Sequence, residues 1–365
     1  MCGRVELLDW DLLPSIIDLA FARWLPVQLL PGPAEDPRAL AECLSHLDFL
    51  RHSVVNQGLR ISLSELLQNF HPFLASDPRD KIYSVLGLAH DAESLTIPLD
   101  YNLPVEQLYI TTACQIFGSS QDIGLLYHNL DKKAFHLPSW VPDWSTWVYG
   151  SLGIAFDASY KASGETVTNI QVYPSEEKIE LAGCLVDRIS KLSSPIGPHY
   201  HKFNGDSAAG RIRWLREQEA FVQALKPYPN GSALTDVLWR TLIGDLTLQK
   251  QRATDSYKQL FEAHLQRSEN GPEYNESMAR EFVDSVRRKS RSRVLATTNR
   301  GYLGAIPETT KPGDWICMFH GAHQLFVIRE GPRGFAYVGS AYVHGLMYGE
   351  ILEADWYAEC VISLI

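Results

Sequence analysis

The chain has 365 residues, of which 45% are hydrophobic and 21% are charged, and its formal net charge at pH 7 is −10. This composition is typical of a folded protein with a large buried core, and it argues against a mainly disordered chain. The acidic balance argues against a nucleic-acid partner, because a nucleic-acid-binding surface needs clustered cations to neutralise phosphates.

The first half of the chain, residues 1–149, is predicted to be mainly helical. Apolar residues recur there at three- and four-residue spacing. Ser62 and Glu65 fit a capping box, and Asp77 before Pro78 predicts an N-cap followed by proline at the first helical position. The predicted helical segments are LLPSIIDLAFARWL, DPRALAECLSHLDFL, SLSELLQNFHPFL, PRDKIYSVLGLA and PVEQLYITTACQIF.

This region ends in the loop LPSWVPDWS, residues 137–145. Its two prolines exclude a helix interior or a central strand, because proline lacks an amide donor and restricts the residue before it. Trp140, Trp144 and Trp147 are large apolar groups of the kind that fill a core or surround a ligand. We predict that they border a substrate or seal a seam between domains.

Residues 150–168 are rich in glycine, serine and alanine and are predicted to be a linker. The remainder, 169–365, is predicted to hold strands over 169–190, a helical insertion over 205–290 and a β meander over 292–357, whose runs end with FAYVGSAYVHG and EILEADW. The expected fold class is α+β, with the helical amino-terminal region packed on a carboxy-terminal antiparallel meander or small barrel.

Candidate catalytic residues are Asp143, Tyr342 and His344. Tyr342 and His344 point to the same face of a strand, and with Tyr348 they make a plausible proton-handling cluster. Asp143 lies between tryptophans, where burial could raise the pKa of its carboxyl group and suit it to acid–base work. The structural alternatives are a hydrogen-bonded strand histidine and an aspartate that accepts backbone amides in the turn.

Arg79 and Tyr83 lie one turn apart in DPRDKIY and are candidate substrate-binding residues. The structural alternative, which we favour, is that Arg79 and Asp80 clamp the following loop to the body. The sequence has no dinucleotide or phosphate-loop fingerprint, no GxSxG and no HExxH, and its six cysteines form no CxxC pair. We therefore predict no cofactor and no metal, and expect the cysteines to be mostly buried.

The chain is also expected to be cytoplasmic. Its amino terminus has acidic residues where a signal peptide would have a basic and then an apolar run. No stretch approaches the ~20 apolar residues of a membrane span.

Several collinear segments resemble the fungal heterokaryon-incompatibility (HET) family. They are CGRVELLDW, ASDPRDKIYSVLGLA, IPLDY, LPSWVPDWS, LAGCLVDRI, WRTLIGD, GYLGAIPE and GDWICMFHGAHQLFVIRE with YVGSAYVHGLMYGE. The resemblance implies a two-part protein, in which an amino-terminal TIR-like module carries the cell-death activity and the following body carries recognition or regulation. The motifs of that module do not occur here, so we expect a body without its effector.

Two functions follow. The favoured one is a stand-alone protein that binds an apolar small molecule and acts as a cofactor-independent cyclase or pericyclase of fungal secondary metabolism, since such chemistry needs mainly a folded substrate pose and one or two hydrogen bonds. The alternative is a non-self recognition or regulatory protein that acts through a protein partner. The first predicts an apolar cavity bordered by Trp140, Trp144, Tyr342 and His344.

Overall fold

The computed structural model describes residues 58–71, 73, 75–127, 133–146, 159–196, 208–225, 227–270, 276–290 and 292–365. Trp147 and the helices predicted before residue 58 lie outside them. The chain divides into two compact units, which are described separately. Unit 1 comprises Met1–Leu108 and Trp144–Tyr149, and unit 2 comprises Tyr109–Asp143 and Gly150–Ile365.

Unit 1 contains short helices whose starts differ in kind. Helix α3 (Leu63–Asn69) begins with the predicted capping box, in which Ser62 and Glu65 satisfy each other's backbone amides. Helix α4 (Asp80–Leu86) begins after Arg79, which is already helical at φ −66° and offers no side-chain cap. The predicted N-cap at Asp77 is therefore wrong. Asp77 instead opens a separate turn, in which its carbonyl accepts the amide of Asp80 at 3.0 Å.

The connecting helix α5 (Val105–Ser120) starts in unit 1 and continues in unit 2. Among the described residues, unit 2 adds the short α6 (Gly124–Tyr127) and four further helices, all inside the predicted insertion over 205–290. These are α8 (Ala208–Gln223), α9 (Leu234–Ile243), α10 (Asp255–Asn270) and α11 (Glu276–Lys289). In the described residues, no helix combines the length and apolarity that crossing a membrane requires.

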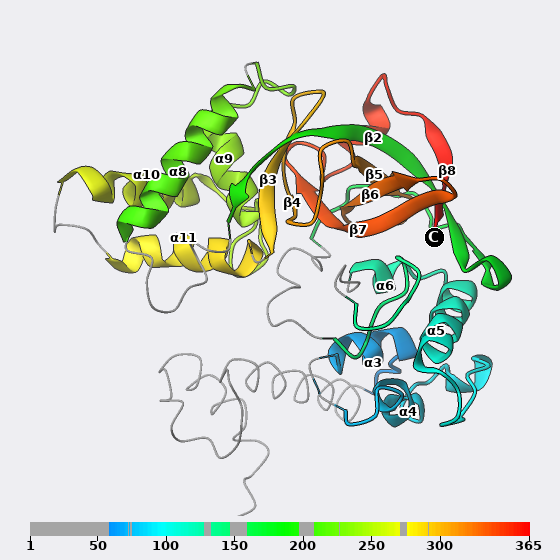
Figure 1. Cartoon of the computed structure of the whole chain (residues 1–365). Helices are drawn as coiled ribbons and strands as arrows, with labels where there is room; N and C mark the ends of the chain where they lie inside the picture. Colours follow the sequence, from blue (N-terminus) through cyan, green and yellow to red (C-terminus); the bar gives the residue numbers. More distant parts are fainter. Residues whose placement is uncertain are drawn as a thin grey trace, which may run out of the picture. The chain divides into compact units, whose positions relative to one another are not determined.

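A closed ring of strands forms the centre of unit 2 (Figure 1). Strand β2 pairs in turn with β3 and β5, and the ring runs β2–β3–β4–β7–β6–β5 and back to β2. This confirms the α+β class and the predicted antiparallel meander. The strands are β1 (Ile170–Tyr173), β2 (Lys178–Pro195), β3 (Arg293–Thr298), β4 (Leu303–Pro307), β5 (Trp315–Phe319), β6 (Leu325–Gly331), β7 (Gly334–Val343) and β8 (Glu359–Leu364).

The 18-residue strand β2 closes this ring because its two halves pair with different strands. Its middle pairs with β5, from Gly183↔Phe319 to Arg188↔Trp315. Its last residues pair with β3, from Ile189↔Thr298 to Pro195↔Val294, across two register shifts. Bulges bend a strand and increase its twist, which lets one long strand serve both sides of a small barrel.

One edge of β7 is shared by two strands, and this leaves a gap. Phe335 pairs with Leu364 of β8, while Tyr342 pairs with Ala305 of β4. Between these contacts, residues 336–341 have no strand on that edge within the described part of the chain. The loop that carries LPSWVPDWS fills part of the gap, because the Ser139 hydroxyl accepts the amide of Tyr337 at 2.8 Å.

The carboxy-terminal end of the chain differs from the sequence prediction. EILEADW does not form a strand, since Glu350–Glu353 is a 3₁₀ helix that follows Gly349 in a left-handed conformation at φ 96°. The last strand is instead β8, which lies beyond the predicted limit of 357 and pairs with β2 from Ile179↔Leu364 to Cys184↔Glu359. The cysteines at 114, 184 and 317 are buried free thiols, as predicted.

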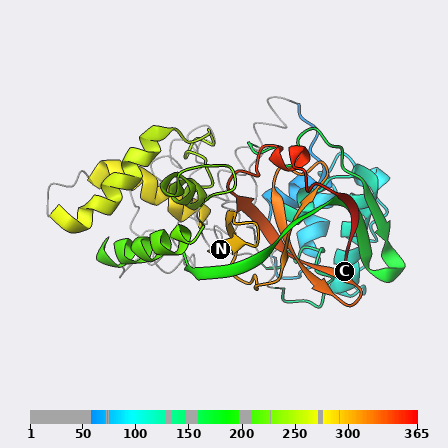
Figure 2. The same ribbon diagram turned by 90° about the horizontal axis from the view of Figure 1, so that it is seen from above.

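The helices α8–α11 pack together beside the β3–β4 side of the barrel in both views (Figures 1 and 2). Their apolar faces and the barrel share one buried core, which includes Trp239 of α9, Phe282 of α11 and Leu303 of β4. The core continues past the ends of the helices, since the buried phenol of Tyr160 donates to the carbonyl of Gly244 after α9. The insertion is thus part of the barrel's core.

Replacing Gly183 with alanine is expected to weaken closure of the barrel. A Cβ atom at this position would lie 2.2 Å from the carbonyl oxygen of Met318 on β5. Because that atom belongs to the backbone, the strands must separate, at a cost of about 1–3 kcal/mol in the free energy of unfolding. Urea denaturation measures the loss.

Gly118→Ala is the matched control, because nothing lies within 4 Å of a Cβ atom there. This exposed helical position should gain up to ~1 kcal/mol. Equal stability of the two variants would contradict the tight approach of β2 and β5.

Candidate functional site

Two of the predicted catalytic residues meet at the end of β7. The Tyr342 hydroxyl lies 3.2 Å from Nδ1 of His344, as expected for side chains two residues apart on a strand. The backbone extends this pairing, since the amide of His344 donates to the carbonyl of Leu303 at 2.9 Å. The chain then turns at Gly345, which has a φ of +83°.

Further tyrosines surround this pair. The ring of Tyr160 lies 5.8 Å from that of Tyr342 and 6.1 Å from that of Tyr348, so the predicted Tyr348 belongs to the same cluster. Tyr228 donates its hydroxyl to the carbonyl of His344 at 2.8 Å and packs its ring 5.7 Å from the imidazole. These contacts hold the turn after β7 from several sides.

Two arginines and an aspartate next to this cluster were not identified from the sequence. Arg240 at the end of α9 pairs with Asp245, and Arg252 donates from Nε to the same carboxylate at 3.1 Å. The Arg252 guanidinium also lies 4.7 Å from the ring centre of Tyr348. Asp245 has 2% of its side chain exposed, and its two cationic partners compensate the charge it buries.

Burial and these arginines determine the protonation state of the pair. Burial lowers the pKa of His344 to about 4, with Arg240 and Arg252 acting in the same direction and Asp236 opposing them. Burial also raises the pKa of the Tyr342 phenol well above its usual value. At neutral pH the pair is therefore a neutral imidazole beside a neutral phenol, which can exchange a hydrogen bond but carries no charge.

The pair is closed to solvent. Tyr342 is 1% exposed and His344 is 7% exposed. A phenol and an imidazole could polarise a substrate, but only if the substrate could reach them. The contacts of Tyr342 and His344 hold β7, the turn after it and β4 together. This is the role expected of a hydrogen-bonded structural histidine, the alternative to catalysis for His344.

The tryptophan loop forms a separate arrangement. Asp143, 4% exposed, accepts the amide of Ala134 at 2.7 Å and that of Phe135 at 3.4 Å through one carboxylate oxygen. Trp140 donates from its indole to the carbonyl of Glu177 at 3.0 Å and packs edge-on against Phe117. Asp143 thus closes the loop on itself, and Trp140 fastens it to the start of β2 and to α5.

Lys133 gives this loop its shape. Its ammonium group donates to the carbonyls of Pro138, Ser139 and Val141, at 2.6, 2.9 and 2.7 Å. A cation that binds three carbonyl groups of one short loop offsets the lack of amide donors at the two prolines. The fixed loop in turn positions Ser139 against β7.

Arg79 and Tyr83 belong to unit 1. Arg79 donates hydrogen bonds from Nε and Nη2 to the two carboxylate oxygens of Asp77, both at 2.9 Å. The hydrogen bonds from Arg79 lower the pKa of the Asp77 carboxyl group. Arg79 also donates to the carbonyls of Tyr101 and Leu103, and Tyr83 bonds to the backbone of Asp100. These contacts hold the loop that follows α4, in line with the clamping alternative.

The predicted site residues thus fall into different places. Tyr342, His344 and Tyr348 form one cluster, and Trp140 and Asp143 belong to the tryptophan loop. Arg79, Tyr83 and the buried Trp144 are in unit 1, and Trp147 lies outside the described residues. The predicted cavity bordered by Trp140, Trp144, Tyr342 and His344 remains a hypothesis, and a different cavity lies along β7.

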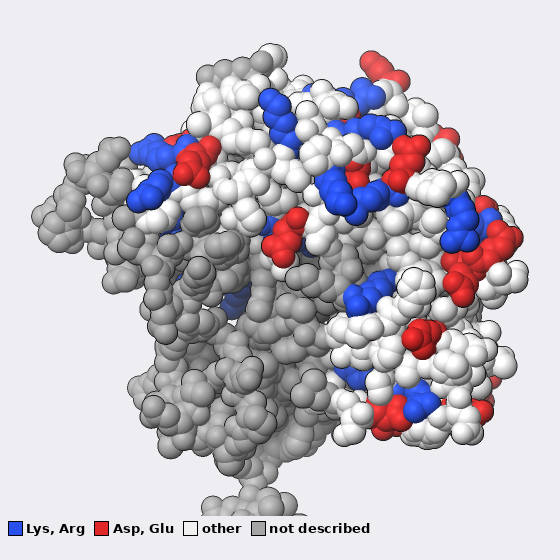
Figure 3. Space-filling view, viewed as in Figure 1, with Lys and Arg blue, Asp and Glu red and all other residues white. Residues whose placement is uncertain are grey.

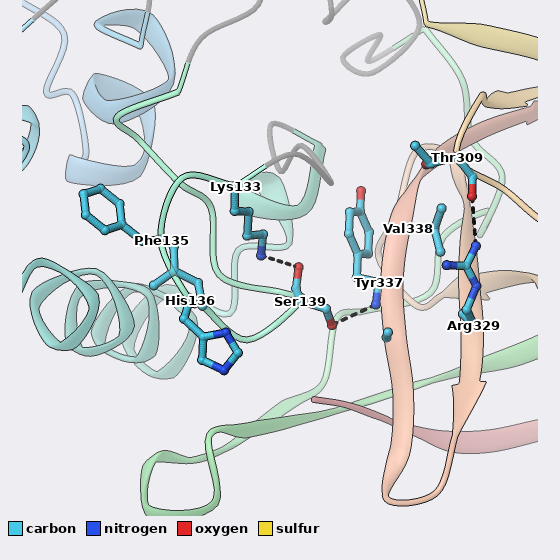
Figure 4. Close-up of a pocket in the computed structure, with 10 residues that line it drawn as sticks. Lys133, Phe135, His136, Ser139, Thr309, Arg329, Tyr337 and Val338 are labelled. Carbon is cyan, nitrogen blue, oxygen red and sulfur yellow. Dashed lines mark hydrogen bonds between the residues drawn. The ribbon is translucent and has the colours of Figure 1, made fainter.

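That cavity is an open groove of about 400 Å³ along β7 (Figure 4). The tryptophan loop forms one wall, and β6 and the turn after β4 form the other. Two residues of the LPSWVPDWS motif, Leu137 and Ser139, line the groove. The groove is lined by Lys133, Phe135, His136, Leu137, Ser139, Thr309, Arg329, Ala336, Tyr337 and Val338.

Comparison with known proteins places this architecture in a family. Residues 251–359 match the Het-6 beta-barrel domain. The chain is also 25% identical over 370 residues to the heterokaryon incompatibility protein 6, OR allele, of Neurospora crassa, and this match covers 84% of the chain. These matches agree with the resemblance of the chain to the heterokaryon-incompatibility (HET) family. The chain spans about half, 54%, of the length of that relative. No solved structure matches it.

The matched domain contains α10, α11 and the strands β3–β7, but not β2. The strand that closes the barrel therefore comes from outside the matched segment. Arg252 lies at the start of the match, and Tyr342, His344 and Tyr348 lie near its end, so the buried polar cluster joins both ends of the domain. In the described residues, no three or more His, Cys, Asp and Glu side chains are grouped to hold a metal ion.

Protonation of His344 should lower the stability of the protein in acid. Its folded pKa, about 4, is lower than its ordinary value of 6.5, so the unfolded chain binds this proton more tightly. The stabilisation is complete above pH 6.5 and is lost as the pH falls towards 4, by up to about 3 kcal/mol. His344→Gln cannot take up the proton, so its unfolding free energy should change less over this range.

His136→Gln is the control for this measurement, because His136 is exposed. Urea denaturation at pH 7, 6, 5 and 4 should give the wild-type slope for this control and a flatter slope for His344→Gln. Identical slopes for all three proteins would show that His344 is not the group that titrates.

Proposed function

We propose that this HET protein acts in heterokaryon incompatibility, as a cytoplasmic recognition or regulatory protein that works through a protein partner. The relationship to the incompatibility protein of Neurospora crassa over 84% of the chain is the observation that carries this proposal. The sequence alone favoured a small-molecule enzyme, and the relationship reverses that preference.

The chemistry of the described residues supports the same choice. The polar groups that the sequence offered as catalytic are all engaged in joining chain segments. Asp143 binds backbone amides, and Tyr342 and His344 are shut inside the protein. A recognition protein needs a stable framework of this kind with variable or open surface around it, and it needs no reactive group.

The charged surface also suits contact with protein. On the face drawn in Figure 3, the described lysine and arginine side chains are interspersed with aspartate and glutamate side chains. Mixed charges give short-range complementarity rather than a long-range field of one sign. A protein partner can match such a pattern residue by residue.

The second candidate is the cofactor-independent cyclase or pericyclase with an apolar substrate. The neutral phenol–imidazole pair of Tyr342 and His344, 3.2 Å apart, favours it, because such a pair can polarise a substrate without a charge. Incubation with polyene intermediates discriminates the candidates. A product of unchanged mass that Tyr342→Phe fails to form would favour the enzyme.

Deleting the gene in one strain of an incompatible fungal pair should allow stable heterokaryons to form. Returning the wild-type gene should restore incompatibility, and so should the Gly118→Ala gene. The Gly183→Ala gene should not, because its barrel is destabilised. Heterokaryon growth and cell death after fusion are the readouts. Pairings that remain unchanged after deletion would contradict the proposed function.

A further inference from the structure

The groove along β7 presents fixed cationic and donor groups without an acidic residue among its described lining side chains. Arg329 is the clearest of them. Its guanidinium binds the two oxygens of Asp314 at 2.9 and 2.8 Å and the carbonyl of Thr309 at 2.9 Å. The Arg329 side chain is 35% exposed while that of Asp314 is 5% exposed, so the cation faces the groove and the anion lies beneath it.

The opposite wall adds two further basic side chains. Lys133 lines the groove while its ammonium group binds the loop carbonyls, and His136 is exposed at the rim. Figure 4 shows the loop residues on one side of Tyr337, and Thr309 and Arg329 on the other. In a protein with a formal net charge of −10, this is a local basic site that favours a negatively charged group.

The groove also has features that select an extended chain. Leu137, Ala336 and Val338 give it apolar walls. Residues 336–341 of β7 have a strand on one edge only within the described chain. On the other edge the Ser139 hydroxyl accepts the amide of Tyr337 and Arg293 donates to the carbonyl of Ser340, so the part of the edge that lines the groove is residues 336–338. A peptide lying along an incomplete sheet edge combines main-chain hydrogen bonds with side-chain pockets.

The size of the groove also suits a ligand. The volume of about 400 Å³ lies within the ~300–1,000 Å³ range of ligand pockets.

We propose that this groove binds a short extended peptide segment of the protein partner, with an acidic residue opposite Arg329 and His136 and apolar residues against Leu137, Ala336 and Val338. The inference rests on the proposed function, because it supplies the chemistry of the partner.

Calorimetric titration of the full chain with acetyl-Ala-Val-Glu-Val-Ala-amide tests the groove. The peptide with glutamine in place of glutamate should bind about tenfold more weakly, as expected for loss of a charge-assisted hydrogen bond. Sodium glutarate serves as a carboxylate without a peptide backbone. Competition by glutarate at the same concentration as the peptide would overturn the peptide proposal in favour of a small carboxylate ligand.

Two variants locate the binding. His136→Glu places an acid at the rim and should weaken binding of the glutamate peptide about tenfold. Ala336→Leu fills the groove without changing charge and should weaken both peptides. Gln251→Glu, an exposed change of the same charge outside the groove, should leave binding unchanged.

Equal affinity for the glutamate and glutamine peptides, no binding of either, or binding that survives both groove variants would overturn the inference. The incompatibility of fungal strains is measured separately from peptide binding. Loss of peptide binding by His136→Glu with unchanged incompatibility would therefore refute the groove as the partner site and leave the proposed function standing.

Discussion

The barrel depends on one strand, β2, that has two sets of partners. The middle of β2 pairs with β5 and its end pairs with β3, so the meander of β3–β7 becomes a closed ring only when β2 is in place. The close approach at Gly183 and the register shifts farther along make this possible within one strand. By pairing with β3 and β5, β2 also covers the two outer edges of the meander, which could otherwise pair with other chains.

Closure of the barrel also determines where the groove and the buried Tyr342–His344 cluster lie. Because β8 and β4 each cover only one end of the β7 edge, the tryptophan loop reaches the gap and Ser139 binds Tyr337 there. The groove exists because this loop, shaped by Lys133, fills the gap only in part. At the far end of β7 the strand leads into the buried Tyr342–His344 cluster, where Arg240 and Arg252 tie the helices to the barrel through Asp245.

Periodicity was sufficient to predict most of the regular elements. The alternation of RVLATT and WICMF identified β3 and β5, and the capping box identified the start of α3. Periodicity gave the wrong structure for EILEADW, because the left-handed Gly349 before this segment starts a 3₁₀ helix. The Tyr342–His344 contact followed from strand geometry. Arg329 and Asp314 could not be paired in advance, because β6 and the turn before β5 meet only in the folded topology. Arg240 and Asp245 are only five residues apart, but their contact depends on the left-handed turn at Gly244 that ends α9.

Native-state hydrogen exchange under increasing urea tests closure by β2 most directly. If β2 closes the barrel, peptides covering 183–195 should open with the same free energy as those covering β3 and β5, because the ring cannot open at β2 and remain intact elsewhere. The contradicting result is exchange of β2 at a lower free energy, with β3–β7 still protected. The meander would then be a stable unit to which β2 is only attached.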